Sequence, residues 1–334
     1  MRKSAFSIAV IACLSLLMVS VAPAKEMKKL AQTGFQFLKI EPDARGSAIG
    51  GAAVPVADDA SALFWNPAGI AMVSGIDFGV YQTSWFAGIK QIALAGVLPV
   101  GNAGFVGVSV LSMNYGDIPQ TTIANNEQGY IEDTYSPSAF AVGLSFARRF
   151  TDLLSIGGQV KYAYESLGAN TTMQPGDTVA QDVDNTLGAV AFDIGTLYYV
   201  GFEDLRISMS IRNFSRQIEY ETEGFQMPLT FAIGAAMDIF KFMDLGEGHS
   251  LTVSATAIHP RDYSERLHVG AEYWLFNTFA LRGGYKFNYD QEGLSAGIGI
   301  KKEISGFNVK LDYSFTDMGS YLGSVHRISV GGSL

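Results

Sequence analysis

Residues 307–315 read Phe-Asn-Val-Lys-Leu-Asp-Tyr-Ser-Phe, an uninterrupted alternation of apolar and polar side chains. Successive side chains of a β-strand point to opposite faces of the sheet, so this stretch has one apolar face and one polar face. A soluble barrel with an apolar core gives the same alternation as a membrane barrel with an apolar exterior. The stretch therefore predicts a strand, and the rest of the chain decides between the two barrels.

Fourteen alternating segments, this one included, fill the chain from about Gly75 to Leu334, joined by links that are short and long in turn. Outer-membrane barrels combine an even number of antiparallel strands with short periplasmic turns and longer extracellular loops. If both ends of the barrel lie in the periplasm, the three longest links (114–137, 165–185 and 215–228) are extracellular, and only 240–248 is a long periplasmic link. We therefore predict an all-β, 14-stranded antiparallel transmembrane β-barrel over residues 75–334, with strands at 75–85, 89–100, 104–113, 138–149, 153–164, 187–199, 205–214, 229–239, 250–259, 265–275, 279–287, 293–301, 306–315 and 323–334.

The composition agrees with strands that face lipid. Hydrophobic residues make up 48% of the chain and charged residues 16%. After residue 24, however, no apolar run approaches the roughly 20 residues that a spanning helix needs. The net charge is −9 and no basic stripe is present, which argues against a nucleic-acid partner.

Residues 1–24 have the pattern of a signal peptide for export. Arg2 and Lys3 precede an almost wholly apolar stretch, and Ala22-Pro23-Ala24 is a small-x-small cleavage site. The alternative is an uncleaved membrane anchor. We expect cleavage, localisation in the bacterial outer membrane, and a mature chain without cysteine, because Cys13 is the only one.

Residues 25–74 lack strand alternation and are dense in glycine and alanine. We predict an N-terminal arm followed by a hatch, a compact segment that plugs the lumen ahead of the first strand. The alternative, a disordered periplasmic arm, fits poorly because the segment has few charges and many apolar residues. The residues expected to shape the hatch are Asp43, Arg45, Gly50, Gly51, Asp58, Asp59, Trp65, Asn66, Pro67 and Gly69.

Charged residues on the strands fall on the polar face. Arg or Lys facing lipid at mid-depth costs about 2–4 kcal/mol, so these side chains are expected to face the lumen. We favour pairing with one another and with hatch charges over direct contact with a ligand. The set is Arg206, Arg212, Arg266, Glu272, Arg282, Lys286, Lys310 and Asp312.

Aromatic residues gather at two strand ends, as in the girdles at a lipid interface. Trp274, Phe276 and Phe279 surround one turn, whereas Tyr285, Phe287 and Tyr289 lie at the opposite end of the next strand.

Signals for chemistry are weak. Residues 293–297 fit G-x-S-x-G, but a nucleophile elbow needs a strand–turn–helix context and this stretch lies among strands. The four histidines are scattered without metal-ligand spacing. We predict no catalytic residues, no metal site and no cofactor.

The segment before the first strand resembles the PorV/PorQ family of outer-membrane proteins, within the FadL-like superfamily of 14-stranded barrels. The similar stretches are Phe37–Gly46 (Phe-Leu-Lys-Ile-Glu-Pro-Asp-Ala-Arg-Gly), Gly50-Gly51, and Val56–Gly69, which ends in Trp-Asn-Pro-Ala-Gly. The closing stretch from Leu311 to Val330 is similar as well. This resemblance implies a hatch in the lumen and passage of hydrophobic or protein cargo.

Two roles remain open. One is export or surface attachment of proteins, with type IX secretion machinery or secreted cargo as partners. The other is FadL-like transport of a hydrophobic small molecule. Long acidic loops with aromatic residues favour the first, because loops on a rigid scaffold are where binding residues concentrate.

Overall fold

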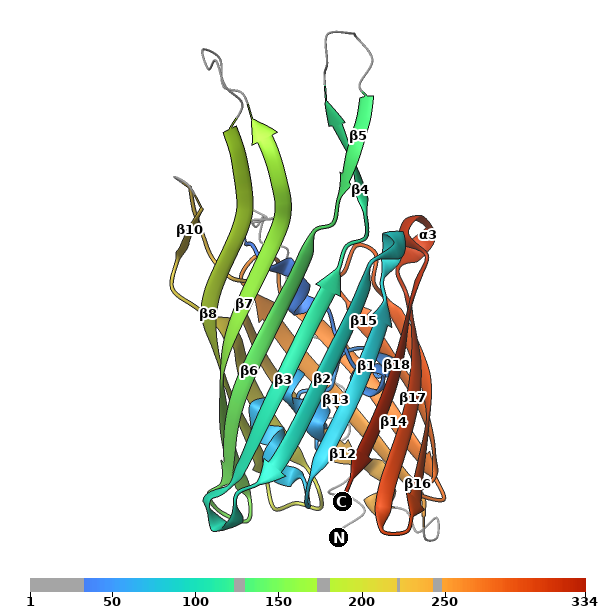
Figure 1. The fold of residues 1–334 in the computed structure, drawn as a ribbon. Helices are drawn as coiled ribbons and strands as arrows, with labels where there is room; N and C mark the ends of the chain where they lie inside the picture. The colour runs from blue at the N-terminus through green and yellow to red at the C-terminus, as the bar shows by residue number, and fades with distance from the viewer. Residues whose placement is uncertain (1–32, 123–129, 173–180, 221–222, 243–247) are drawn as a thin grey trace.

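The computed structural model describes residues 33–122, 130–172, 181–220, 223–242 and 248–334. Fourteen antiparallel strands form a closed barrel, in which the first strand pairs with the last (Figure 1). The predicted fold class is thus confirmed. The barrel strands are β1 (Asp77–Ser84), β2 (Lys90–Pro99), β3 (Phe105–Asn114), β6 (Ser138–Arg149), β7 (Leu154–Thr172), β8 (Gln181–Tyr199), β9 (Arg206–Phe214), β12 (Thr230–Asp238), β13 (Ser250–Pro260), β14 (Arg266–Leu275), β15 (Phe279–Phe287), β16 (Leu294–Ile304), β17 (Phe307–Asp317) and β18 (Ser324–Ser333).

Two long hairpins extend beyond one end of the barrel, opposite the end where β1 begins and β18 ends (Figure 1). We call these the hairpin end and the terminal end. The prediction that the long links at the hairpin end are loops was wrong in part. The link 114–137 contains β4 (Ile118–Thr122) and β5 (Tyr130–Tyr135), β7 and β8 continue through most of 165–185, and the link 215–228 contains β10 (Ile218–Tyr220) and β11 (Glu223–Phe225).

These extra strands lack the regular alternation of the barrel strands, although Ile218 of β10 is buried and Phe225 of β11 packs against the core. A two-stranded ribbon beyond the membrane does not separate lipid from a lumen, so its sequence need not alternate. Residues 181–186, for example, read Gln-Asp-Val-Asp-Asn-Thr. The alternation criterion therefore misses them.

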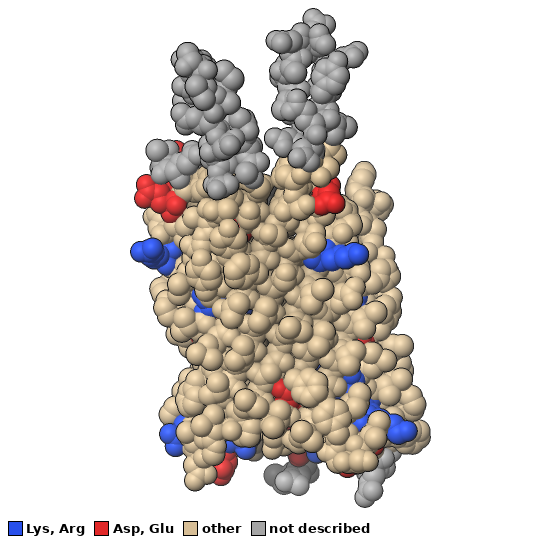
Figure 2. All heavy atoms as spheres, viewed as in Figure 1, with Lys and Arg blue, Asp and Glu red and all other residues tan. Residues whose placement is uncertain are grey.

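The apolar side chains of β17 face outward and its polar side chains face the lumen, as predicted. Leu311 and Tyr313 are 49% and 39% exposed on the outside, whereas Ser314 and Thr316 are fully buried on the inside. Figure 2 shows the same on one face of the molecule, where the barrel surface is mainly uncharged and most of the visible charged residues lie toward the two ends. None of the helices among the described residues is both long and apolar enough to span a bilayer.

Cysteine labelling tests this register. We expect Leu311→Cys and Tyr313→Cys to react with a lipid-soluble maleimide in membranes, and Ser314→Cys and Thr316→Cys to stay unlabelled. The background is low, because Cys13 is the only native cysteine. Equal labelling at all four positions would contradict the register.

Inside the barrel lies the described part of the hatch, residues 33–74 (blue in Figure 1). It folds into four short helical turns, three of which begin with a side chain that accepts a backbone hydrogen bond, as helix N-caps do. Asp43 accepts from Gly46, Asp59 from Ser61, and Asn66 from Ala68. The turns are η1 (Gln36–Lys39), α2 (Ala44–Ala48), η2 (Ala60–Phe64) and η3 (Pro67–Met72); elsewhere in the chain lie η4 (Phe86–Gly88), η5 (Gly101–Ala103), η6 (Ile239–Phe242) and α3 (Gly319–Leu322).

The core of the molecule is the contact between the hatch and the inner wall. Phe37, Trp65 and Ile70 of the hatch are buried against the wall, where the facing residues are mostly alanines such as Ala141 and Ala163. Small side chains on the wall leave room for the hatch backbone and its larger side chains.

Candidate functional site

Glycines on the inner wall provide two seats for the hatch. Gly157 of β7 and Gly195 of β8 pair across the strands, and a Cβ on either would overlap the Asn66-Pro67 turn. Gly270 of β14 and Gly284 of β15 form a second pair, where a Cβ would overlap residues 49–50 of the hatch. The hatch backbone therefore rests directly on the wall at both seats.

Several predicted hatch residues shape the turns at these seats. Gly50 and Gly51 have φ values of +66° and +75°, in the left-handed region that favours glycine. Asn66 Nδ2 donates to the Thr196 carbonyl at 3.1 Å and to the Val54 carbonyl at 3.3 Å. Gly69 lies so close to Ala57 that a Cβ would overlap its carbonyl oxygen.

Trp65 and Asp43 join the two halves of the hatch. The indole Nε1 donates to Asp43 Oδ1 at 2.5 Å, while the Gly46 amide donates to Oδ2 at 2.7 Å. Burial raises the pKa of the Asp43 carboxyl to about 7, against these two hydrogen bonds. Asp43 forms no ion pair with a described residue, contrary to the expected pairing with wall charges.

A charge network ties the hatch to the wall toward the terminal end. Arg45 donates to both oxygens of Glu272, each at 2.9 Å, and to Asp58 at 2.5 Å. On the wall, Arg282 bridges Glu272 and Asp312 at 2.6 Å each. Lys310 reaches Asp59 of the hatch at 3.2 Å.

This network borders a cavity of ≈ 470 Å³ at the terminal end. Its lining is mostly polar and includes Arg45, Asp58, Asp59, Asp77, Trp274, Arg282, Lys301 and Lys310. Cations and carboxylates balance closely enough here that most charges have a partner within the network.

A second cavity of ≈ 470 Å³ lies on the other side of the hatch, toward the hairpin end. Lys286 is held there between Glu41 of the hatch at 2.9 Å and Glu292 at 2.6 Å. Burial raises the pKa of the Glu41 carboxyl, but the charges of Lys286 and Arg327 outweigh it and hold the value at about 2. The surroundings of Glu41 are thus strongly positive.

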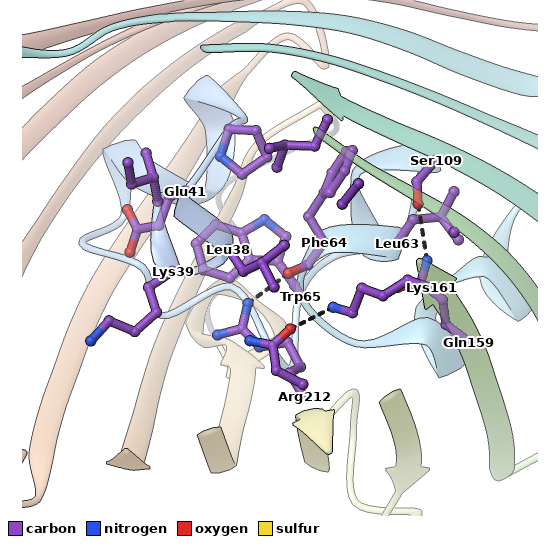
Figure 3. A pocket seen from close by; sticks show the side chains of 16 residues that line it. Leu38, Lys39, Glu41, Leu63, Phe64, Trp65, Ser109, Gln159, Lys161 and Arg212 are labelled. Carbon is purple, nitrogen blue, oxygen red and sulfur yellow. Dashed lines mark hydrogen bonds between the residues drawn. The ribbon is translucent and has the colours of Figure 1, made fainter. Parts of the chain in front are cut away.

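A small cavity of ≈ 40 Å³ continues from this one toward the β3–β7 wall (Figure 3). Arg212 points into it and donates to the Phe64 carbonyl at 2.6 Å. Beside it, Lys161 forms an ion pair with Asp193 at 2.7 Å, and Gln159 donates to Ser109 at 3.1 Å. One buried water needs about 10–15 Å³ of cavity volume, so this cavity has room for a few waters or one small polar group.

All eight charged strand residues named from the sequence lie on the inner side of the wall. Seven of them divide into two groups, and Arg206 stands apart from both. Glu272, Arg282, Lys310 and Asp312 belong to the network at the terminal end, while Arg212, Arg266 and Lys286 line the cavity at the hairpin end. Arg206 donates to the Pro55 carbonyl of the hatch at 2.8 Å.

The girdle prediction was wrong for two residues. Trp274 lines the lumen under Arg282, and Tyr289 lines the cavity at the hairpin end. Phe276, Phe279, Tyr285 and Phe287 are exposed on the outside, as a girdle requires.

Sequence reasoning missed several residues at the hairpin-end cavity. Arg327 shares the inward register of β18, a signal that was available. Lys39 and Asp262, which form an ion pair at 2.8 Å, come from segments without regular alternation and gave no signal. Glu41 lies within the stretch that carries the family resemblance but was not singled out.

Nothing in the described residues supports a metal centre or the nucleophile motif. No group of three or more His, Cys, Asp or Glu side chains there is arranged to hold a metal ion. Ser295 of the G-x-S-x-G stretch is buried within β16, and its hydroxyl donates to Thr316 at 3.3 Å.

Comparison with known proteins gives a family and a fold. The family model "Type IX secretion system membrane protein PorP/SprF" matches residues 63–331. Among curated protein sequences, none matches this chain.

Similar solved structures are FadL-type barrels. The CymD monoaromatic hydrocarbon channel superposes with a TM-score of 0.56 at 10% identity, covering 87% of this chain and 96% of that one. A FadL homologue from Pseudomonas aeruginosa gives 0.51 at 11% identity, covering 87% and 97%. The toluene transporter TodX of Pseudomonas putida gives 0.50 at 12% identity, covering 84% and 96%. At such low identity the likeness shows the fold alone.

Proposed function

This chain belongs to the PorP/SprF family of type IX secretion system membrane proteins and is a bacterial outer-membrane β-barrel, and we propose that it serves the export or surface attachment of proteins. The family match over residues 63–331 carries this proposal. Its narrower form is a role of the PorV/PorQ type, which the resemblance of Phe37–Gly69 supports. The expected partners are secreted cargo or secretion machinery.

The hairpin end offers surfaces suited to a polypeptide partner. β7 pairs with β8 as far as Thr172, but β6 pairs with β7 only as far as Ser166. On the other side, β9 pairs with β8 only from Phe192 onward. Among the described strands, none therefore pairs with the outer edges of this hairpin, and such edges are where an extended chain can add a strand.

A second candidate function is transport of a hydrophobic small molecule. The observation that favours it is the cavity at the hairpin end, whose lining includes Trp85, Phe86, Ile89 and Met113. The fold is also that of channels described as carrying monoaromatic hydrocarbons. The charged residues between this cavity and the terminal end make the lumen an unfavourable path for an apolar molecule, so we rank this function second.

Affinity purification distinguishes the two functions. We expect the tagged barrel, extracted from its native outer membrane, to bring down secreted or secretion-machinery proteins in stoichiometric amounts. A variant in which a short turn replaces residues 169–184 should lose them, because the hairpin edges are gone. The matched control, Lys302→Gln at the terminal end, should retain them. Recovery of the barrel alone with an apolar ligand would favour transport instead.

A further inference from the structure

The lining of the cavity at the hairpin end combines two kinds of side chain. Apolar and aromatic ones are Trp85, Phe86 and Ile89 from the β1–β2 connection and Met113 from β3. Cations come from the hatch and from β9, β14, β15 and β18, and they are Lys39, Arg212, Arg266, Lys286 and Arg327. The two kinds meet where Arg327 lies over the Trp85 ring.

The lining of this cavity has more positive charge than its own carboxylates can neutralise. Only Glu41 and Glu292 share the lining with these five cations, although the chain as a whole has a net charge of −9. Both of these carboxylates pair with Lys286, and Lys39 pairs with Asp262 behind the lining. No described carboxylate therefore forms an ion pair with any of the three arginines.

The three guanidinium groups are held in place by other contacts. Arg266 lies between two aromatic rings, 4.3 Å from the Tyr263 centroid and 3.8 Å from the Tyr289 centroid. Arg327 is buried, donates to the Glu41 carbonyl at 2.8 Å, and lies over the Trp85 ring. Arg212 donates to the Phe64 carbonyl.

These contacts leave donors unused. The Nε atoms of Arg212 and Arg266 are buried and have no hydrogen-bond partner. A buried charged donor without an acceptor pays its desolvation cost, so guanidinium groups with unused donors around one cavity favour an anion that accepts from them.

We propose that this cavity binds an organic carboxylate joined to an aromatic or apolar group. The carboxylate matches the fork of N–H donors on a guanidinium group, and the apolar body lies against Trp85, Phe86 and Ile89. Glu41 and Glu292 repel a doubly charged phosphate more than a singly charged carboxylate. A cavity of ≈ 470 Å³ is in the range of small-ligand sites.

The same chemistry has two sources. One is a free amphiphilic acid, and the other is a polypeptide segment with an acidic residue beside aromatic ones. The proposal holds for either source, and it does not depend on the role of the barrel in secretion.

Binding of dansyl-phenylalanine to the full-length protein in detergent tests the site. This probe joins a carboxylate to aromatic groups, and its amide is the matched uncharged control. By fluorescence anisotropy, corrected for detergent alone, we expect the acid to bind at least roughly tenfold more tightly than the amide, the effect of about 1.4 kcal/mol. Arg212→Gln and Arg266→Gln should each weaken the acid about tenfold and leave the amide unchanged.

Control variants separate a loss of acid binding from misfolding, and competing ligands identify the source of the natural carboxylate. Arg148→Gln, at the exposed terminal end of β6, should bind like the parent, and heat-modifiability on gels should show that each variant forms the barrel. Displacement of the probe by acetyl-Phe-Glu-Phe-amide supports a polypeptide ligand, whereas displacement by free aromatic acids alone supports an amphiphile. Equal affinity for acid and amide, or unchanged affinity in both arginine variants, would overturn the proposal.

Discussion

Replacement of Gly195 by valine is expected to force the hatch from its seat and open the lumen. A Cβ at this position overlaps Asn66 Oδ1 and lies 3.0 Å from Pro67 Cδ. The turn cannot move aside easily, because Asn66 is fixed by the Thr196 and Val54 carbonyls and Pro67 already contacts Gly157. Overpacking of a rigid contact costs about 1–3 kcal/mol or more, which here is relieved by displacement of the hatch.

Single-channel recording in planar bilayers measures this outcome. We expect Gly195→Val to show a frequent open conductance that the parent lacks, and deletion of residues 37–69 to show it permanently. Gly96→Val is the matched control, because nothing lies within 4 Å of its Cβ position. If the deletion variant folds as a barrel and conducts no more than the parent, the hatch does not close the lumen.

Loss of the Arg45 guanidinium should have a comparably large effect at the other side of the hatch. Arg45→Gln leaves Asp58 without its partner and removes both hydrogen bonds to Glu272. Glu272 keeps its ion pair with Arg282 and the Asp58 side chain is half exposed, so the loss stays below the roughly 3–5 kcal/mol of a buried charge left without any partner. Lys310 still holds Asp59, so we expect the hatch to loosen at this end and the barrel to remain folded.

Limited proteolysis with chymotrypsin reports this loosening, because the buried Phe37 and Trp65 become accessible when the hatch moves. Cleavage there should be much faster in Arg45→Gln than in the parent and intermediate in Arg45→Lys, which keeps the charge and loses the paired geometry. Lys302→Gln, an exposed change at the end of β16, serves as the control. Cleavage at the parental rate in Arg45→Gln would show that the network does not hold the hatch.

The alternation of residues predicts the barrel well, because a strand in a membrane must separate its two faces completely. The predicted bounds 138–149 and 279–287 coincide with β6 and β15. The same alternation rule would have corrected the prediction of the aromatic girdle. Trp274 is two residues from Glu272, so both side chains face inward. Tyr289 lies beyond the end of β15, where Asn288 has φ +64° and the chain changes direction.

The partners within the lumen could not be predicted from the sequence. Arg45 and Glu272 are far apart in the chain, and their contact depends on where the hatch sits and on the register of β14. The inward direction of Arg212 and Arg266 was predictable, but not that they lack a carboxylate, whereas Arg282 bridges two. Which charges pair is decided by three-dimensional placement, and periodicity carries no information about it.

The hatch contacts strands from the middle and from the end of the chain, and this has a consequence for the closure of the barrel. The Ala44 amide donates to Ser329 of β18, Lys310 of β17 reaches Asp59, and the Asn66-Pro67 turn rests on β7 and β8. The hatch precedes every strand in the chain and afterwards touches early, middle and late ones. A barrel of another strand number would have a different diameter and would lose part of these contacts. The contacts therefore stabilise the closure in which β1 meets β18 over the alternatives.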